Sequence, residues 1–307
     1  MTSRKSTRTS ALGAALLVAG LLLGGLLPAG AAQASSATVE TQHLLVSDAT
    51  GNVSDARLKD LAGQAQAMLE RVLEFWSADS GTARFGKIRV MFDVPRRGNY
   101  SCVFYWDGRG PERVRVVRVF GFEGQMQMLA HKLTSAVFPQ KDKLIRNMMG
   151  ILTEEQLGNP QTFPRCGFGS DAWVLALIKA GSYAPLNGLG PEHGSWGMKD
   201  AGGGMLMVLD RPRQHASYAE AGSFGGYLFQ TYGLGRLLRL QRLSQEKDRP
   251  WQDVFGLGLE ELEANWLAAL KAKEKAREAE VSAVSGFLGT DPVTACTQAQ
   301  QRASGLR

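Results

Sequence analysis

The chain has 307 residues, of which 44% are apolar, and its formal net charge is +6. This positive balance is too mild to indicate nucleic-acid binding, and no basic patch with interleaved aromatic residues occurs in the sequence. The length suits one large domain or two small ones, and the apolar content is sufficient for a proper core.

The N-terminal segment has the three-part pattern of a secretory signal peptide. Arg4, Lys5 and Arg8 come first, an uncharged apolar run occupies residues 11–27, and small residues dominate positions 31–34. The apolar run has 17 residues and four glycines, which is marginal for a membrane-spanning helix. We therefore predict that residues 1–34 are a signal peptide, and that cleavage lowers the formal net charge to +3. The mature protein is then expected to be periplasmic or secreted, without a membrane span.

Three cysteines follow, and in an oxidising compartment we expect them to form one disulfide and leave one thiol. They are Cys102, Cys166 and Cys296, so three pairings are possible. Cys102 and Cys166 each follow residues typical of loops, and we favour this pair as the disulfide candidate. Their wide spacing excludes a Cys-x-x-Cys metal or redox motif.

A strand and a helix are predicted at the start of the mature chain. Residues 40–47 alternate enough for a short strand, and Ser54 or Asp55 is expected to cap the helix that follows. Apolar residues recur in this helix at steps of three and four, so one face is buried. That face holds Leu58, Leu61, Ala65, Met68, Leu69, Val72 and Trp76.

Two further strands are predicted from alternating apolar residues at 88–92 and 114–116. Gly108, Gly110 and Pro111 supply a turn before the second of them. This arrangement favours a hairpin or a meander.

The second half is predicted to be mostly helical. Its helices are expected at about residues 123–138, 141–156, 171–180, 218–243 and 259–270. The fourth is expected to bend near Gly233, and the last to continue through a charged run to residue 280. Residues 185–216 are expected to be loop-rich, and the chain from residue 286 to be a tail to which Cys296 is attached.

Strings of glycine, serine and aromatic residues punctuate these helices. They are Ala221-Gly222-Ser223-Phe224, Tyr227-Leu228, Tyr232-Gly233, Trp251, Phe255-Gly256, Leu259 and Trp266, with Tyr183-Ala184-Pro185-Leu186 before them. Over about residues 40–275 the sequence resembles the peptidase MA-like, or gluzincin-type, zinc metallopeptidase domains of exported bacterial proteins. The resemblance implies an α+β, zincin-like domain at residues 35–285 and a flexible tail at 286–307. A small mixed or antiparallel sheet is expected first, and a mostly helical part after it.

Catalysis in such domains depends on a helical His-Glu-x-x-His motif, in which two histidines one turn apart bind Zn²⁺ and the glutamate acts as the general base. The corresponding stretch here is His131-Lys132-x-x-Ser135. Lys132 brings a cation to the metal position, and an ammonium of ordinary pKa cannot take a proton from water. The third ligand, a glutamate in a Glu-Gly context, corresponds to Met149. A thioether suits zinc poorly.

These replacements predict an inactive metallopeptidase-like protein that binds a peptide or an envelope protein, with zinc not expected. Two alternatives remain open. A metal site rebuilt from His131, His193 and Glu154 or Glu155 would give an active zinc peptidase. A structural component of the envelope would use the leftover cysteine for an intermolecular disulfide.

Overall fold

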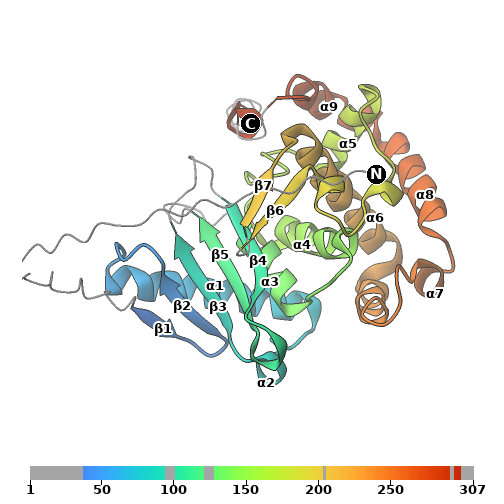
Figure 1. Ribbon diagram of the computed structural model, residues 1–307. Coiled ribbons are helices and arrows are strands. Elements are labelled where there is room, and N and C mark those ends of the chain that lie inside the picture. Colours follow the sequence, from blue (N-terminus) through green and yellow to red (C-terminus); the bar gives the residue numbers. More distant parts are fainter. Residues whose placement is uncertain (1–36, 94–100, 121–127, 203–204, 291–293, 299–307) are drawn as a thin grey trace, which may run out of the picture. The chain divides into compact units, whose positions relative to one another are not determined.

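The computed structural model describes residues 37–93, 101–120, 128–202, 205–290 and 294–298, and it has an α+β fold (Figure 1). Residues Ser36–Arg307 form one compact unit. A five-stranded mixed sheet comes first in the chain, and a mostly helical part follows. The predicted signal peptide lies outside the described residues. In the described part, no helix is long and apolar enough to cross a membrane.

The sheet has the strand order β1-β2-β3-β5-β4. Its strands are β1 (Thr38–Glu40), β2 (Leu44–Asp48), β3 (Ile88–Asp93), β4 (Ser101–Asp107) and β5 (Val114–Phe120). The three central strands β2, β3 and β5 are parallel, and an antiparallel strand lies at each edge. Parallel neighbours need a crossover connection. Helix α1 (Asp55–Trp76) lies in the connection between β2 and β3.

The predicted hairpin of residues 88–92 and 114–116 is wrong in its pairing. These two strands, β3 and β5, are parallel neighbours. The hairpin partner of β5 is β4, which pairs with it in antiparallel register from Ser101–Phe120 to Asp107–Val114. The turn after β4 contains Gly108 and Gly110, both with positive φ, as expected for a hairpin connection. Cys102 therefore lies in a strand and not in a loop.

The structure confirms the predicted first helix. The Ser54 hydroxyl caps α1 by accepting a hydrogen bond from the backbone N–H of Arg57 at 3.3 Å. The predicted apolar face is buried apart from the half-buried Met68, and it packs against β2 and against α3 (Leu129–Val137). A small helix, α2 (Thr82–Phe85), follows before β3.

The labelled α-helices that follow α3 in the described part of the chain make up most of the second half. They are α4 (Lys143–Leu157), α5 (Ser170–Lys179), α6 (Arg211–Leu243), α7 (Trp251–Phe255), α8 (Leu259–Lys273) and α9 (Glu278–Ser285). Helix α6 bends at Gly233, whose φ of 76° is non-helical, as the sequence predicts. The helix predicted to run from residue 259 to 280 is in fact interrupted after Lys273.

The segment 185–216 is less irregular than predicted. It holds a two-stranded antiparallel sheet of β6 (Met198–Gly202) and β7 (Met205–Val208), and α6 already begins at Arg211. The Asp210 carboxylate caps α6 by accepting from the backbone N–H of Arg213 at 2.9 Å. Polar and glycine residues in and around these strands conceal the alternation that a half-buried strand would give.

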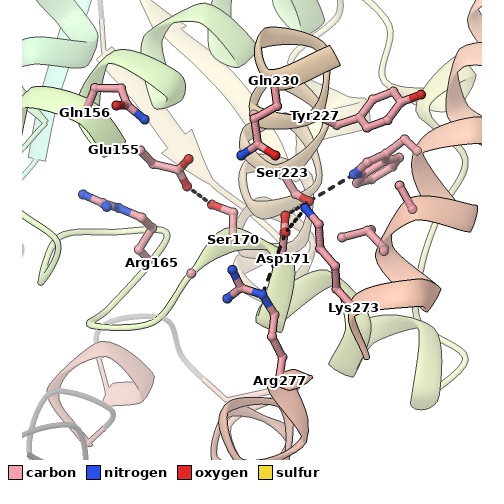
Figure 2. Close-up of a pocket in the computed structure, with 15 residues that line it drawn as sticks. Glu155, Gln156, Arg165, Ser170, Asp171, Ser223, Tyr227, Gln230, Lys273 and Arg277 are labelled. Carbon is pink, nitrogen blue, oxygen red and sulfur yellow. Dashed lines mark hydrogen bonds and ion pairs between the residues drawn. The ribbon is translucent and has the colours of Figure 1, made fainter. Parts of the chain in front are cut away.

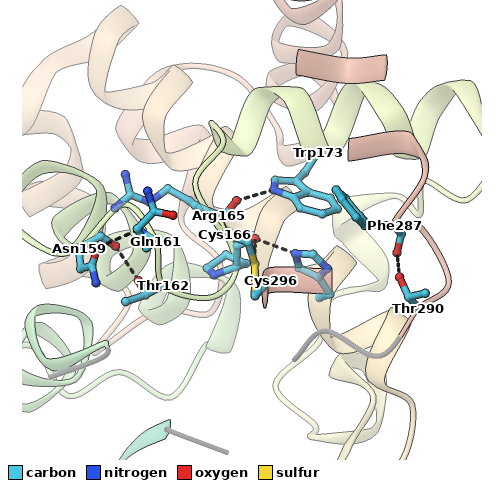
Figure 3. Close-up of a disulfide and its surroundings, with 11 residues drawn as sticks. Asn159, Gln161, Thr162, Arg165, Cys166, Trp173, Phe287, Thr290 and Cys296 are labelled. Carbon is cyan, nitrogen blue, oxygen red and sulfur yellow. Dashed lines mark hydrogen bonds between the residues drawn. A yellow bond between two sulfur atoms is a disulfide. The ribbon is translucent and has the colours of Figure 1, made fainter. Parts of the chain in front are cut away.

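The disulfide joins Cys166 to Cys296, with 4.5 Å between their Cα atoms, so the predicted Cys102–Cys166 pair is wrong (Figure 3). Cys102 is unpaired because β4 turns its side chain into the core, where it is 3% exposed. The flexible tail predicted for residues 286–307 also needs correction where it is described. Phe287 and Ala295 are buried, so this segment packs on the domain.

Candidate functional site

The residues aligned with the zinc motif lie on α3, which packs against α4. His131 and Lys132 are the third and fourth residues of α3, whose N-cap is Met128 with a left-handed φ of 57°. His131 is fully buried and Lys132 is 8% exposed. These two side chains are therefore the centre of the candidate site, and the protein interior rather than solvent determines their ionisation.

The Lys132 ammonium is bound to the His131 ring. Its Nζ lies 3.2 Å from His131 Nε2, and 5.7 Å from the centre of the Tyr218 ring. Burial, and then the nearby Lys132 and Arg146 charges, hold the pKa of His131 well below its ordinary value. The ring is therefore neutral, Nε2 accepts a hydrogen bond from the ammonium, and Nδ1 carries the ring proton. His131 Nδ1 has no hydrogen-bond partner among the described residues.

Helix α4 approaches the other side of this ring through a glycine. A Cβ atom built on Gly150 would lie 2.2 Å from His131 Cδ2 and 2.6 Å from Nε2, so only glycine fits here. One turn earlier, the buried Asn147 side chain interacts with the same ring. The α4 residues brought to His131 are thus Gly150 and Asn147. The sequence analysis did not predict Asn147, because the Glu-Gly pattern of the third zinc ligand aligns with Met149-Gly150.

Ser135 and Met149, the other positions aligned with zinc ligands, are occupied differently. The Ser135 hydroxyl donates to the backbone carbonyl of His131 at 3.1 Å, within its own helix. Met149 is 1% exposed and belongs to the apolar core. Neither position therefore presents a side chain suited to holding zinc.

Glu154 and Glu155, the predicted alternative ligands, point in different directions from α4. Glu154 accepts hydrogen bonds from the backbone N–H groups of His131 at 3.1 Å and Asn159 at 3.3 Å. It therefore stabilises the start of α3, where a negative charge is favourable. Burial raises its pKa. Glu155 instead accepts from the Ser170 hydroxyl, on the side of α4 that faces α5.

His193, the last predicted ligand, contacts Lys143 at the start of α4. Lys143 lies one turn before Asn147 on the same stripe of the helix, so this loop does approach the site as the sequence suggested. Burial, followed by the Arg146 charge, lowers the pKa of Lys143 to about 7. His193 thus joins a cationic environment and not a metal-binding one.

The site is dominated by cations. The pKa of Lys132 is lowered to about 8, and burial is the largest cause. The Arg146 charge also lowers this pKa, whereas Cys102 and Glu154 raise it. Burial also lowers the pKa of Arg146. Lys132 still carries its proton at neutral pH, because its pKa remains above 7.

These residues do not fit a zinc ion. In the described part of the chain, no three His, Cys, Asp or Glu side chains come together as a metal site. His131 is the sole residue of the predicted ligand set whose ring nitrogen faces the position, and that nitrogen is engaged by an ammonium. A divalent cation at Nε2 would meet a fixed positive charge, so we derive no chemistry through a metal here.

Comparison of the chain with protein-family models, curated proteins and solved structures gives no match.

Proposed function

We propose that this protein is an exported, metallopeptidase-like domain without catalytic activity, which binds an extended peptide or protein segment. Its fold would be the zincin-like arrangement of an N-terminal sheet over a pair of packed helices. The disulfide between Cys166 and Cys296 agrees with an oxidising compartment outside the cytoplasm.

The observation that supports this proposal most is the position of Lys132. Its ammonium lies 3.2 Å from His131 Nε2, the ring atom through which the aligned histidine would bind zinc. A tethered positive charge there takes the electrostatic role that a bound cation would have towards its surroundings. It can neither polarise a carbonyl group as a metal does nor activate a water molecule.

The edge strand β4 supports a peptide-binding role. It pairs with β5 on one side, and no other described strand pairs with its outer edge. Such an edge offers backbone N–H and C=O groups to an added strand, which is a common mode of peptide recognition. Helix α3 packs against β4, so a peptide bound at this edge would run close to the candidate site.

The alternative of an envelope component joined by an intermolecular disulfide receives little support. The leftover cysteine is Cys102, which is buried. Burial is the main cause that raises the pKa of its thiol to about 12, so the reactive thiolate is scarce at neutral pH.

Metal content tests the first half of the proposal. We expect mature protein, purified without chelators and re-exposed to equimolar zinc, to retain almost no zinc by mass spectrometry. It should also leave a generic protein substrate intact. About one zinc per chain, together with cleavage that a chelator abolishes, would establish the alternative of an active peptidase.

Peptide binding requires its own test. Peptides selected from a display library should bind saturably, and N-methylation of alternate amides should weaken binding for one set of amides and not for the other. That asymmetry arises because only every second amide of an added strand faces the sheet. If no saturable peptide emerges, or if both methylated sets bind equally, binding at the β4 edge is wrong.

A further inference from the structure

A cavity of about 260 Å³ lies beside the C-terminal end of α4, and none of the side chains around His131 lines it. It is a partly open cavity lined by residues of α4, α5, α6 and α8, by the segment before α5 and by Arg277 (Figure 2). Its wall includes charged groups of both signs. The cavity is smaller than the roughly 300 Å³ at which pockets for drug-sized ligands begin. A small polar molecule is therefore the occupant that its size and lining suit.

Glu155 is the first of two charged groups in this wall that lack a contact ion partner. Its carboxylate accepts a hydrogen bond from the Ser170 hydroxyl, and Figure 2 shows it turned toward that residue. Within the described residues, no Lys, Arg or His nitrogen lies within 4.0 Å of it. Burial, the largest cause, raises its pKa despite the Ser170 hydroxyl and the more distant Arg165 charge.

Arg165 is the second such group. Its side chain is mostly buried, and its Nη2 donates to the backbone carbonyl of Glu154 at 3.0 Å. The Glu154 and Glu155 carboxylates act on it only from beyond ion-pair distance in the described part of the chain. A guanidinium has five N–H donors, and among the described residues the Glu154 carbonyl is the acceptor within hydrogen-bond distance of this one. Buried charges of this kind are costly unless they are paired.

The remaining charges of the cavity have ion partners within 4.0 Å. The Asp171 carboxylate accepts from the Ser223 hydroxyl at 2.6 Å and faces Lys273 at 3.4 Å. Arg277 contacts Glu280 at 3.0 Å and lies at 4.0 Å from Asp171. These groups therefore need no charged group of a ligand as an ion partner, in contrast to Glu155 and Arg165.

We propose that this cavity binds a small zwitterion, a free α-amino acid, whose ammonium pairs with Glu155 and whose carboxylate pairs with Arg165. The two protein charges have opposite signs, belong to one wall and are separated by more than ion-pair distance, so one molecule carrying both groups satisfies both. The proposal is independent of the peptide site at β4, because the cavity lining includes no residue of β4 and none of the side chains around His131.

Blocked analogues test the two charges of the ligand separately. Thermal-shift measurements with the common L-amino acids on the mature protein should find at least one that stabilises it, and titration calorimetry should show one site per chain. For that amino acid, the N-acetyl derivative lacks the ammonium and the carboxamide derivative lacks the carboxylate. We expect each to bind at least tenfold more weakly.

Two variants locate the site. For a Cβ atom built on Gly226, the one neighbouring atom within 4 Å is Glu155 Oε2, at 4.0 Å. Gly226 lines the cavity, so Gly226→Leu should fold normally and fill the cavity with its side chain. Gly63→Leu, in an exposed position of α1 with no atom within 4 Å, is the matched control. Glu155→Gln keeps an acceptor for Ser170 and removes the charge. Gly226→Leu should abolish binding, Glu155→Gln should weaken it at least tenfold, and Gly63→Leu should leave it unchanged.

The contrary outcomes each overturn the proposal. Equal binding of the N-acetyl derivative would make this an anion site, and equal binding of the carboxamide would make it a cation site. Binding that survives Gly226→Leu would lie elsewhere on the protein. If no amino acid stabilises the protein at millimolar concentration, the cavity is not an amino-acid site.

Discussion

At the scale of single residues, the burial of Lys132 has a measurable consequence for stability. Its pKa is lowered to about 8 in the folded protein, against the ordinary 10.5, so the unfolded chain binds this proton more tightly. Relative to Lys132→Met, the free energy of unfolding of the wild type should therefore rise between about pH 8 and pH 10.5. The full change is on the order of 3 kcal/mol, since one pKa unit corresponds to about 1.4 kcal/mol.

Urea unfolding of both proteins at several pH values in this window measures the effect. Taking the difference between them removes the titration of groups that do not interact with Lys132, and adding Cys102→Ala to both proteins removes the coupled thiol. A difference that stays constant over the window would mean that Lys132 is better solvated than its 8% exposure indicates.

Gly150 sets a second residue-scale test, in which two effects of one methyl group compete. Gly→Ala in a helix interior ordinarily stabilises by about 1 kcal/mol. At Gly150 the new Cβ would lie 2.2 Å from His131 Cδ2, and overpacking of this kind typically costs about 1–3 kcal/mol. We expect Gly150→Ala to lower the free energy of unfolding and Gly63→Ala to raise it.

A double-mutant cycle separates the contact from other causes. His131→Ala removes the ring that the new methyl group meets, so Gly150→Ala should be harmless or stabilising in that background. An equal loss in both backgrounds would show that the close approach of α3 and α4 at this point is not what requires glycine.

At the scale of elements, the register of α4 on α3 decides where a zinc site could be built. The sequence pairs Met149 with the third zinc ligand, whereas the structure brings Asn147 to the His131 ring. The triple variant Lys132→Glu, Ser135→His and Asn147→Glu should therefore bind about one zinc per chain. The same triple with Met149→Glu in place of Asn147→Glu should not, with circular dichroism confirming that both are folded. The reverse preference would restore the register predicted from the sequence.

Local patterns predicted the elements well where one signal determined them. Ser54 and the apolar face of α1, the glycine bend in α6 and the helical second half follow from capping and periodicity. Pairing between elements was predicted less well, because a strand pattern does not specify its partner. The parallel pairing of β3 with β5, and the place of β4 at the edge, depend on contacts distant in sequence.

In the candidate site, too, local patterns were easier to predict than contacts between segments distant in sequence. The sequence directed attention to His131 and Lys132, because their stretch resembles a motif with fixed spacing. It missed Asn147, and it left the cavity beside Glu155 and Arg165 unrecognised. Those residues come from separate segments, and only the packing of α4, α5, α6 and α8 brings them together.

At the scale of the whole molecule, the Cys166–Cys296 disulfide fixes the C-terminal segment to the loop before α5 and closes a span of 130 residues. In the chain-entropy model, a loop of this length contributes about 4–5 kcal/mol by restricting the unfolded chain. The variant Cys166→Ala/Cys296→Ala should therefore unfold at lower urea concentration, by an amount of that order. The described residues after 286 should also become more sensitive to limited proteolysis, because the disulfide is the covalent link that ties this segment to the loop before α5.

Cys102→Ala is the matched control, since it removes a buried cysteine without removing the cross-link. This variant should lose only the free energy of unfolding that a small truncation in the core costs, and its C-terminal segment should stay protected from proteolysis. Thiol labelling identifies the pairing directly: without reductant, the wild type should expose one reactive thiol per chain and only after unfolding, and that thiol should be lost in Cys102→Ala. A labelled thiol that maps to Cys166 or Cys296 in the oxidised protein would mean that the C-terminal segment is held by packing alone, and its protection should then survive reduction.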